Sequence, residues 1–319
     1  MSWMKQLAAL AVSALAIAAA PVHAQAFFRI GTGGTAGTYY PVGGMIANAV
    51  SQPGKIVVTA QASNGSLANV NGIAAGSLES GFSQADVVTW AQKGTGIFEG
   101  KPNIPNLRLI ANLYPESVHI VVRKGLGVKT PADLKGKRVA LDEPGSGTLI
   151  NARIILAAYG VQESDIKPEY IKPNQAGDKL KDGSLDAFFF TGGAPAGAIS
   201  ELASAGGGIE LIPIEGPQAD GLRMASPFFA PDVIPADTYK GVAAVKTLAV
   251  GAQWVTSDKA DANTVYEVTK ALFSDSTQQT LAAGHAKGKL ITKENAVKGA
   301  GIPFHPGAEK YYREVGLIK

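Results

Sequence analysis

The sequence predicts an α/β protein. Its 319 residues are 46% hydrophobic and 17% charged, which is enough apolar material for two packed domains and too much for a disordered chain. Short apolar runs alternate along the chain with segments of helical spacing, and this alternation favours mostly parallel sheets covered by helices. The 38 glycines follow no fixed period, so they indicate tight turns and places where backbone approaches a neighbour closely.

The first part of the chain repeats a strand followed by a helix. Short apolar runs predict three strands, at 27–30, 55–60 and 81–84. A segment with helical spacing follows each strand, at 40–50, 70–75 and 86–92. Two further strands, 107–113 and 118–123, then flank the segment 114–117. This order is typical of an open α/β sheet.

The second part of the chain continues the alternation. Strands are predicted at 138–141, 186–190, 210–214 and 249–255. Helices are predicted at 149–159, 194–205 and 262–273. No repeat of fixed period and no low-complexity linker is visible in the sequence. We therefore expect the two parts to build domains of the same α/β class.

The N-terminus has the pattern of a secretory signal. Lys5 is followed by an apolar run at 7–20 and then by small residues ending at Ala24. The run is shorter than the roughly 20 residues that a transmembrane helix needs. We therefore predict a signal peptide at 1–24 and an exported mature protein that begins at Gln25.

Glycine and hydroxyl residues form four of the strand-to-helix joints, at 31–38, 63–66, 145–148 and 191–193. Ligands of open α/β sheets bind at the carboxyl ends of strands, where helices begin. The first N–H groups of a helix lack partners and carry partial positive charge, so they attract a carboxylate or phosphate. Four such joints in one chain predict an anion-binding cleft. At any single joint, the serines and threonines are equally well explained as helix N-caps.

Enzyme signatures are incomplete. A loose dinucleotide fingerprint starts at Gly31, but no Asp or Glu occurs in 25–78 to bind a ribose. Ser146 lacks the outer glycines of a nucleophile elbow, because Pro144 and Thr148 occupy those places. No nucleophile, base and orienting group assemble. We therefore expect no catalytic residues, no enzymatic activity and no cofactor.

Metal and nucleic-acid binding are also not expected. The sequence has no cysteine, and the histidines of the mature chain are scattered without the spacing of zinc ligands, at His119, His285 and His305. The formal net charge of +3 is too balanced for a protein that binds nucleic acid by neutralising phosphates. A small-molecule partner remains the simplest expectation.

Seven segments stand in a characteristic order along the mature chain: 30–41 (IGTGGTAGTYYP), 63–69 (SNGSLAN), 82–87 (FSQADV), 113–123 (LYPESVHIVVR), 133–138 (DLKGKR), 145–148 (GSGT) and 185–195 (LDAFFFTGGAP). Together they resemble the TAXI family. Members of that family are extracytoplasmic solute receptors of tripartite ATP-independent periplasmic (TRAP) transporters. The resemblance covers essentially the whole mature chain.

The resemblance implies a two-domain fold of the periplasmic-binding-protein-like type II, with the ligand cleft between domains joined by crossover strands. It implies a periplasmic solute-binding protein that captures a small organic acid or amino acid, such as glutamate or 2-oxoglutarate. It also implies docking onto TRAP transporter membrane subunits that use a sodium gradient.

The candidate ligand-binding residues would form two walls. The first-domain wall would consist of Thr38, Tyr39, Ser63, Asn64, Ser66 and Gln84. The second-domain wall would consist of Ser146, Gly147, Thr148, Thr191, Gly192 and Gly193. The other TRAP receptor family clamps its carboxylate with an arginine, and only Arg153 could serve in that way here. Helix N-termini and hydroxyls would otherwise hold the carboxylate.

Four aromatic residues at the strand ends have two possible roles, at Tyr39, Tyr40, Tyr114 and Phe190. They could pack over the ligand, or they could belong to the core. The sequence pattern leaves both roles open.

We expect the domains to be joined at 113–118 and 250–254, because Pro115 and Gly251 interrupt these apolar strands. Domain I would then be 25–116 plus 251–319, and domain II would be 117–250. A ligand that bridges both domains would shift the population towards a closed form. Two alternatives stay open: a receptor of an ATP-driven importer or periplasmic sensor, and an exported enzyme with the same fold.

Overall fold

The computed structural model describes residues 25–205 and 208–319, and the predicted signal peptide at 1–24 lies outside them. Ten strands form one continuous sheet in the order β2-β1-β3-β10-β4-β7-β5-β6, with β8 beside β4 and β9 beside β10. The strands are β1 (Ala26–Gly31), β2 (Ile56–Gln61), β3 (Ser80–Gln84), β4 (Leu107–Arg123), β5 (Arg138–Ala140), β6 (Lys167–Glu169), β7 (Ala187–Gly192), β8 (Ile209–Leu211), β9 (Ala230–Ile234) and β10 (Val245–Ser257).

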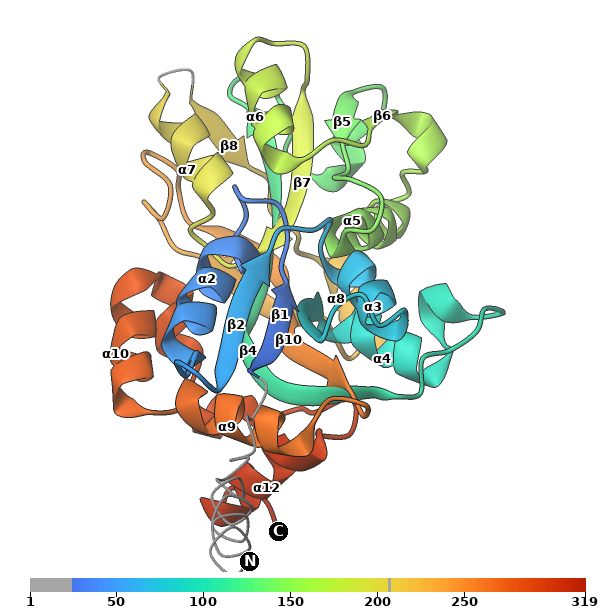
Figure 1. The fold of residues 1–319 in the computed structure, drawn as a ribbon. Helices are drawn as coiled ribbons and strands as arrows, with labels where there is room; N and C mark the ends of the chain where they lie inside the picture. Colours follow the sequence, from blue (N-terminus) through green and yellow to red (C-terminus); the bar gives the residue numbers. More distant parts are fainter. Residues whose placement is uncertain (1–24, 206–207) are drawn as a thin grey trace, which may run out of the picture.

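Helices flank this sheet (Figure 1). The α-helices are α2 (Tyr39–Val50), α3 (Ser66–Ala74), α4 (Ala85–Lys93), α5 (Gly147–Ala158), α6 (Pro173–Lys181), α7 (Gly197–Ser204), α8 (Pro217–Ala225), α9 (Ala262–Leu272), α10 (Asp275–Gly284), α11 (Lys293–Ala296) and α12 (Pro306–Glu314). Short 3₁₀ turns complete the structure, at η1 (Gly96–Phe98), η2 (Pro131–Leu134), η3 (Glu163–Asp165) and η4 (Ala286–Leu290).

The sheet is mixed, so the expectation of mostly parallel sheets is wrong. Strand β1 pairs in parallel with β2 and β3, and β5 pairs in parallel with β6 and β7. The long strands β4 and β10 run antiparallel to each of their neighbours. An alternating pattern in the sequence identifies strands but not their neighbours, because pairing brings together segments that are distant along the chain.

Strands β4 and β10 connect two lobes. Residues 107–112 of β4 lie beside 253–257 of β10, which in turn pair with β3. Farther along, 117–122 of β4 pair with β7. We call one end of the sheet, with α2, α3, α4, α9, α10 and α12, the β1–β3 lobe, and the other end, with α5 to α8, the β5–β7 lobe (Figure 1).

The two strands predicted at 107–113 and 118–123 are one strand, β4. Pro115 does not end it. The partner of Pro115 is Gly251, and the register between β4 and β10 shifts directly after this pair. A proline lacks the N–H that a regular ladder needs, so an irregular position in the pairing tolerates it.

Each lobe has an apolar core on both faces of the sheet. In β7, Phe188 and Phe189 are at most 1% exposed and belong to different clusters, because successive side chains of a strand point to opposite faces. In the β1–β3 lobe, Trp254 packs edge-on against Phe28 and Phe82. These cores hold the strand ends that carry the glycine-rich joints.

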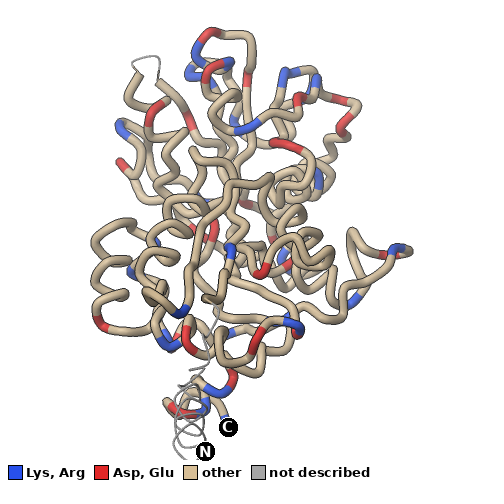
Figure 2. Tube along the Cα trace, viewed as in Figure 1, with Lys and Arg blue, Asp and Glu red and all other residues tan. Residues whose placement is uncertain are grey.

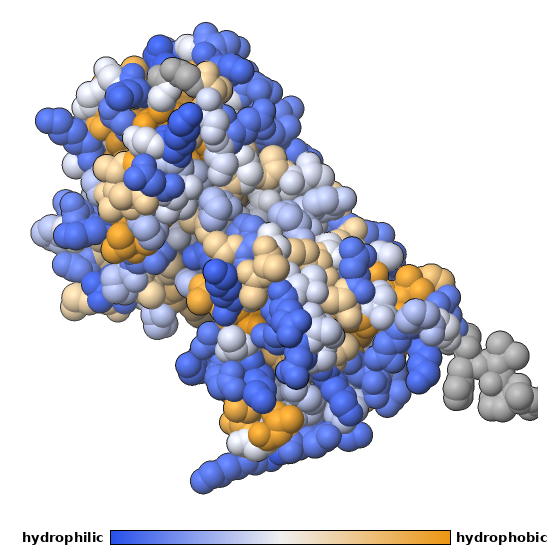
Figure 3. Space-filling view, turned by 90° about the vertical axis from the view of Figure 1, so that its left-hand side faces the viewer, coloured by the Kyte–Doolittle hydropathy of each residue, from blue (hydrophilic) through white to orange (hydrophobic). Residues whose placement is uncertain are grey.

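Along the backbone trace, Lys and Arg are intermixed with Asp and Glu in both lobes (Figure 2). On the face shown in Figure 3, hydrophobic residues form small separate patches among hydrophilic ones. Within residues 25–205 and 208–319, no helix has both the length and the apolar character needed to cross a membrane.

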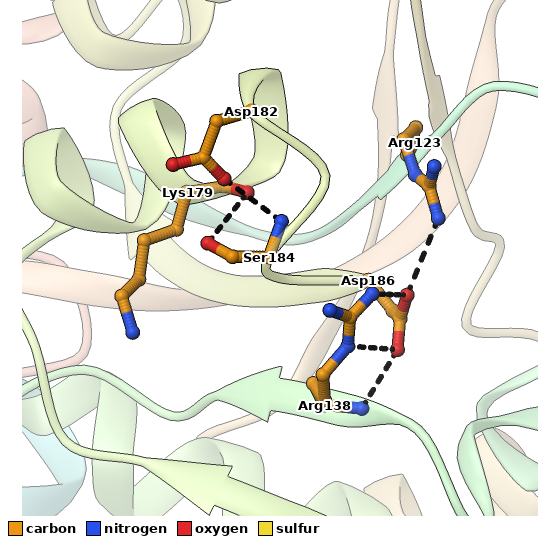
Figure 4. Close-up of polar contacts among 6 residues, drawn as sticks. All are labelled: Arg123, Arg138, Lys179, Asp182, Ser184 and Asp186. Carbon is orange, nitrogen blue, oxygen red and sulfur yellow. Dashed lines mark hydrogen bonds and ion pairs between the residues drawn. The ribbon is translucent and has the colours of Figure 1, made fainter.

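A partly buried ion pair holds the start of β7 in the β5–β7 lobe (Figure 4). The Asp186 carboxylate accepts hydrogen bonds from the Arg138 backbone N–H and Nε, at 2.9 and 3.0 Å, and from its Nη2 at 2.6 Å. Arg123 adds a longer contact of 3.4 Å. The Arg138 guanidinium is the main cause that lowers the pKa of Asp186 to about 2. The pair ties β7 to β5 and to the end of β4.

Replacing Asp186 by asparagine should lower the unfolding free energy at pH 7 by about 2 kcal/mol. An unfolded aspartate titrates near a pKa of ~3.9, so the contribution of Asp186 is complete above that pH and disappears as the pH falls towards 2. Urea unfolding at pH 7 and pH 3 should therefore show a smaller difference from the wild type at pH 3. Asp178→Asn, at an exposed position of α6, is the matched control. An equal deficit at both pH values would contradict this assignment.

Candidate functional site

A cavity lies where the two lobes meet. Its empty volume is about 560 Å³, part of it open to solvent. We call it the interlobe cavity. The residues that line it are Gly33, Gly34, Ala36, Gly37, Thr38, Tyr39, Asn64, Gly65, Ser66, Gln84, Glu116, Asp142, Glu143, Ser146, Gly147, Thr148, Pro173, Asn174, Phe190, Thr191 and Gly192.

Four helices begin at the interlobe cavity. Helix α2 starts at Tyr39, α3 at Ser66, α5 at Gly147 and α6 at Pro173, and each of these residues lines the cavity. Helix N-termini carry unpaired N–H groups and partial positive charge. The arrangement therefore offers a solute anion several donors, from both lobes.

The structure gathers most of the predicted site residues around this cavity. Those that line it are Thr38, Tyr39, Asn64, Ser66, Gln84, Ser146, Gly147, Thr148, Thr191 and Gly192. The joints before α2, α3 and α5 meet here because these helices begin at the cavity, whereas Thr191 and Gly192 reach it from the end of β7.

Two predicted residues, Ser63 and Gly193, are not among the lining residues. The single Ser63 hydroxyl proton lies within reach of the Thr32 carbonyl and of Asn69 Oδ1, at 2.9 and 2.7 Å, and the hydroxyl oxygen accepts from the Gly65 N–H. The Gly193 carbonyl accepts a hydrogen bond from Thr38 Oγ1 at 2.6 Å. Through these bonds Ser63 supports Gly65 and Gly193 supports Thr38, two residues that line the cavity.

Two hydroxyl groups of the second wall, those of Ser146 and Thr148, already have partners. Ser146 Oγ accepts from the Leu149 N–H at 3.1 Å, so the N-cap interpretation is confirmed at this joint. Thr148 Oγ1 accepts from the Thr191 N–H at 3.1 Å. Both contacts use the oxygen as acceptor, and both hydroxyls also hydrogen-bond to the Asp142 carboxyl group.

Two polar atoms at the cavity have no hydrogen-bond partner. Gln84 Oε1 and Thr191 Oγ1 are buried and unpaired within the described part of the chain. An unpaired buried polar group costs free energy, so native structures rarely keep one without a role. Atoms of this kind on facing walls are suited to a bound solute.

The sequence did not identify three acidic residues that line the cavity: Glu116, Asp142 and Glu143. Asp142 and Glu143 directly follow β5 and precede the joint at 145–148, so their place at a strand end was an available signal. Glu116 is the middle of a long buried strand, and only the fold brings it to the cavity.

Burial controls the charge of these acids. It raises the pKa of Glu116 to about 8, against the lowering effect of the Tyr39 hydroxyl, which donates to Glu116 at 2.8 Å. Burial likewise raises the pKa of Asp142 to about 7, although hydrogen bonds to its carboxylate oppose this rise. Both carboxyls therefore bind a proton at or near neutral pH.

The residues that line the cavity include no lysine, arginine or histidine. Arg153, the candidate clamp, instead pairs with Glu163 at 2.6 Å on an exposed face of α5. The helix termini and neutral donors must consequently supply any anion binding in this cavity.

Of the aromatic candidates, Tyr39 and Phe190 line the cavity. Tyr40 is exposed, and Tyr114 is buried outside the lining. The aromatic surface available to a solute thus comes from one residue of each lobe.

The histidines have structural contacts. His119 is buried between the Phe190 carbonyl and the Tyr239 hydroxyl, and burial lowers its pKa to about 4. His305 caps α12 through the Gly307 N–H. In the part of the chain that the structure describes, no cluster of three or more His, Cys, Asp or Glu side chains could hold a metal ion.

Direct hydrogen bonds join the two lobes around the cavity. They run from Thr38 Oγ1 to the Gly193 carbonyl (2.6 Å), from Asn64 Nδ2 to the Pro144 carbonyl (3.0 Å), from the Ala68 N–H to the Gly145 carbonyl (3.0 Å), from the Ala198 N–H to the Ala36 carbonyl (3.1 Å) and from Asn151 Nδ2 to Asp86 Oδ2 (2.9 Å). The structure therefore represents a closed arrangement of the lobes.

A family model described as the NMT1-like family matches residues 30–316. Among solved structures, a protein of Bordetella bronchiseptica RB50 is 19% identical, with 92% of this chain and 82% of that chain covered and a TM-score of 0.55. PhnD1 from Prochlorococcus marinus (MIT 9301), in complex with methylphosphonate, is 12% identical, with 92% and 99% covered and a TM-score of 0.53.

The alkanesulfonate-binding protein SsuA from Xanthomonas axonopodis pv. citri, bound to MOPS, is 19% identical, with 91% of this chain and 84% of that chain covered and a TM-score of 0.49. At these identities the first two structures establish the fold alone. The expected two-domain, periplasmic-binding-protein-like α/β fold is thereby confirmed.

Proposed function

The chain belongs to the NMT1-like family, and we propose that it is an extracytoplasmic solute-binding receptor of a membrane importer. The interlobe cavity, with helix N-termini from both lobes, carries this proposal. A solute that contacts both walls stabilises the closed arrangement by its greater affinity for that form. The receptor then delivers the solute to membrane subunits without changing it chemically.

The hinge of this receptor is proposed at the middle of β4 and β10. Pro115 pairs with Gly251 at the irregular register of these strands, which supports bending there. The corresponding division is domain I, 25–116 plus 251–319, and domain II, 117–250. The location proposed is the periplasm, reached through the signal peptide at 1–24.

The solute proposed is a small anion such as 2-oxoglutarate, glutamate or a related organic acid or amino acid. The N-termini of α2, α3 and α5 support an oxyanion, and an incipient helix binds carboxylate and phosphonate by the same N–H groups. Methylphosphonate, the ligand of PhnD1, is therefore included in the ligand class to be tested.

Two importer classes are distinguished by experiment. The motif resemblance supports TRAP membrane subunits, whereas the similarity to a methylphosphonate-bound protein favours the alternative of an ATP-driven importer or sensor. Uptake measured in vesicles with the membrane proteins encoded beside this receptor separates them. Uptake driven by a sodium gradient supports TRAP, and uptake that needs ATP supports the alternative.

A thermal-shift screen tests the receptor function itself. Organic acids, amino acids and methylphosphonate should include at least one compound that raises the melting temperature in proportion to the logarithm of its concentration. Mass spectrometry should recover that compound unchanged after incubation. Turnover of the compound would favour the exported-enzyme alternative, and the absence of any stabilising anion would contradict the proposal.

Thr191→Val should lower the affinity for that solute about tenfold, because the unpaired Thr191 hydroxyl lines the cavity. The change keeps the shape of the side chain and breaks no existing hydrogen bond of the hydroxyl, so the melting temperature should not fall. Calorimetric titration measures the affinity. Thr89→Val is the matched control, since Thr89 Oγ1 is also buried and unpaired but lies outside the cavity. Unchanged affinity of Thr191→Val would remove Thr191 from the site.

A further inference from the structure

Glu116 occupies an unusual position for a carboxyl group. It lies in the middle of β4, is 1% exposed and lines the interlobe cavity. The Tyr39 hydroxyl donates to its Oε2 at 2.8 Å. Among the described residues, no lysine, arginine or histidine forms an ion pair with it. A buried carboxylate without a paired cation is costly, so this position favours the protonated acid.

Among the groups that face Glu116, Asp86 adds to this preference, whereas the Tyr39 hydrogen bond and the charge of Lys287 oppose it. Asp86, at the start of α4, is a second buried acid and raises the pKa of Glu116. Tyr39 of α2 and Tyr114 of β4 are neutral, and Asp142 and Glu143 lie on the wall of the same cavity. Lys287 of η4 is the cation that acts on Glu116, by a long-range attraction, and burial lowers the pKa of Lys287 as well.

We propose that Glu116 enters the closed complex as a neutral carboxylic acid and donates its proton in a hydrogen bond to the anionic solute. This inference rests on the proposed function. A protonated Glu116 provides the cavity with the hydrogen-bond donor that a lysine or arginine would otherwise supply. Tyr39 donates to one carboxyl oxygen, and the other oxygen carries the proton towards the cavity.

A dependence of binding on pH follows. Opening the lobes would hydrate Glu116 and lower its pKa, whereas closure over a solute excludes water and raises it. Binding therefore takes up a proton at any pH between these two values. The affinity should be greatest at low pH and should fall by up to about tenfold per unit as the pH rises through this range.

Calorimetric titration at pH 6 and pH 8 tests this inference with three probes, 2-oxoglutarate, L-glutamate and glutarate, whose carboxylates stay ionised across the range. Repeating each titration in buffers of different ionisation enthalpy counts the protons taken up. We expect wild-type protein to bind at least one probe about tenfold or more tightly at pH 6, with net proton uptake. Glu116→Gln, which imitates the neutral acid, should depend less on pH than the wild type and take up one proton fewer, because Asp142, whose pKa is also raised, keeps its own titration in this range.

Two further variants complete the experiment. Glu143→Gln removes another carboxyl of the same cavity, one that Lys172 approaches at 3.7 Å, and should keep the wild-type dependence on pH. Tyr39→Phe removes the bond that stabilises the ionised form of Glu116, so tight binding should extend to higher pH. This variant tests the inference even if Glu116→Gln fails to fold.

Two results would overturn the inference while leaving the receptor function intact. One is wild-type binding that is independent of pH or stronger at pH 8. The other is a folded Glu116→Gln protein that loses binding at both pH values, which would mean that the solute needs an ionised Glu116. Failure of all three probes to bind wild-type protein at either pH would instead overturn the proposed carboxylate ligand, and the inference with it.

Discussion

Gly147→Ala is expected to weaken solute binding by about 10- to 100-fold while leaving each lobe folded. A Cβ at Gly147 would lie 2.2 Å from Gln84 Oε1 and 2.4 Å from Gln84 Cδ. Gln84 is 2% exposed and lines the cavity, so moving it aside would take up space that the solute needs. The two residues belong to different lobes, and the clash therefore opposes closure but not the open form. Overpacking of this kind costs about 1–3 kcal/mol.

Calorimetry gives the affinity, and small-angle X-ray scattering at saturating solute reports whether the molecule still becomes compact. Gly44→Ala is the matched control, because a Cβ there, within α2, meets nothing within 4 Å. The control should bind normally and gain slightly in stability from the better helix propensity of alanine. Wild-type affinity in Gly147→Ala would show that closure does not bring Gly147 against Gln84.

Asn69→Asp should lower the unfolding free energy by about 3–5 kcal/mol. The Asn69 amide is fully buried, and the two protons of its Nδ2 are shared among the carbonyls of Gly31, Thr32 and Phe82, at 3.0, 2.6 and 2.7 Å. These bonds hold the ends of β1 and β3 together behind the cavity. A carboxylate would face three carbonyl oxygens with no proton to donate, so each contact would become repulsive.

Urea unfolding followed by circular dichroism measures this loss. Asn71→Asp makes the same chemical change at an exposed position of the same helix, α3, and should leave the unfolding midpoint nearly unchanged. A midpoint for Asn69→Asp equal to that of the wild type would mean that Asn69 does not organise the joint.

The sequence predicted the positions of the main strand-to-helix units well. Residues 40–50, 149–159 and 262–273 correspond to α2, α5 and α9, because helical spacing and capping residues are local signals. The helix predicted at 194–205 begins later, at Gly197. The segment 173–181, which is the polar helix α6, was not predicted. Its apolar positions are few, so its periodicity is weak.

The pairing of the strands was not available from the sequence. Apolar alternation shows that 118–123 and 249–255 are strands, but not that both run through the centre of one mixed sheet. Contacts between β4 and β10 join residues more than a hundred positions apart, such as Ser117 and Ala249. Only the packing of the whole chain decides such a partnership.

The candidate site divides in the same way. The sequence by itself determined the glycine and hydroxyl joints, because turn conformation and the start of a helix depend on neighbouring residues. Gly65 is one example, since it has a φ of +98°, a backbone conformation that favours glycine, directly before α3. The chain therefore carries, in its local sequence, the places where helix N-termini can meet a solute.

Only the tertiary structure decided which of these residues share a cavity and what charge surrounds it. Thr38 contacts Gly193 across 155 positions, and Tyr39 contacts Glu116 across 77. The acidity of Glu116 and Asp142 likewise comes from burial, which is a property of the assembled lobes. Local sequence determines which hydrogen-bond donors the site can offer. The closure of one lobe on the other determines which residues face each other and how far burial raises the pKa values of the cavity acids.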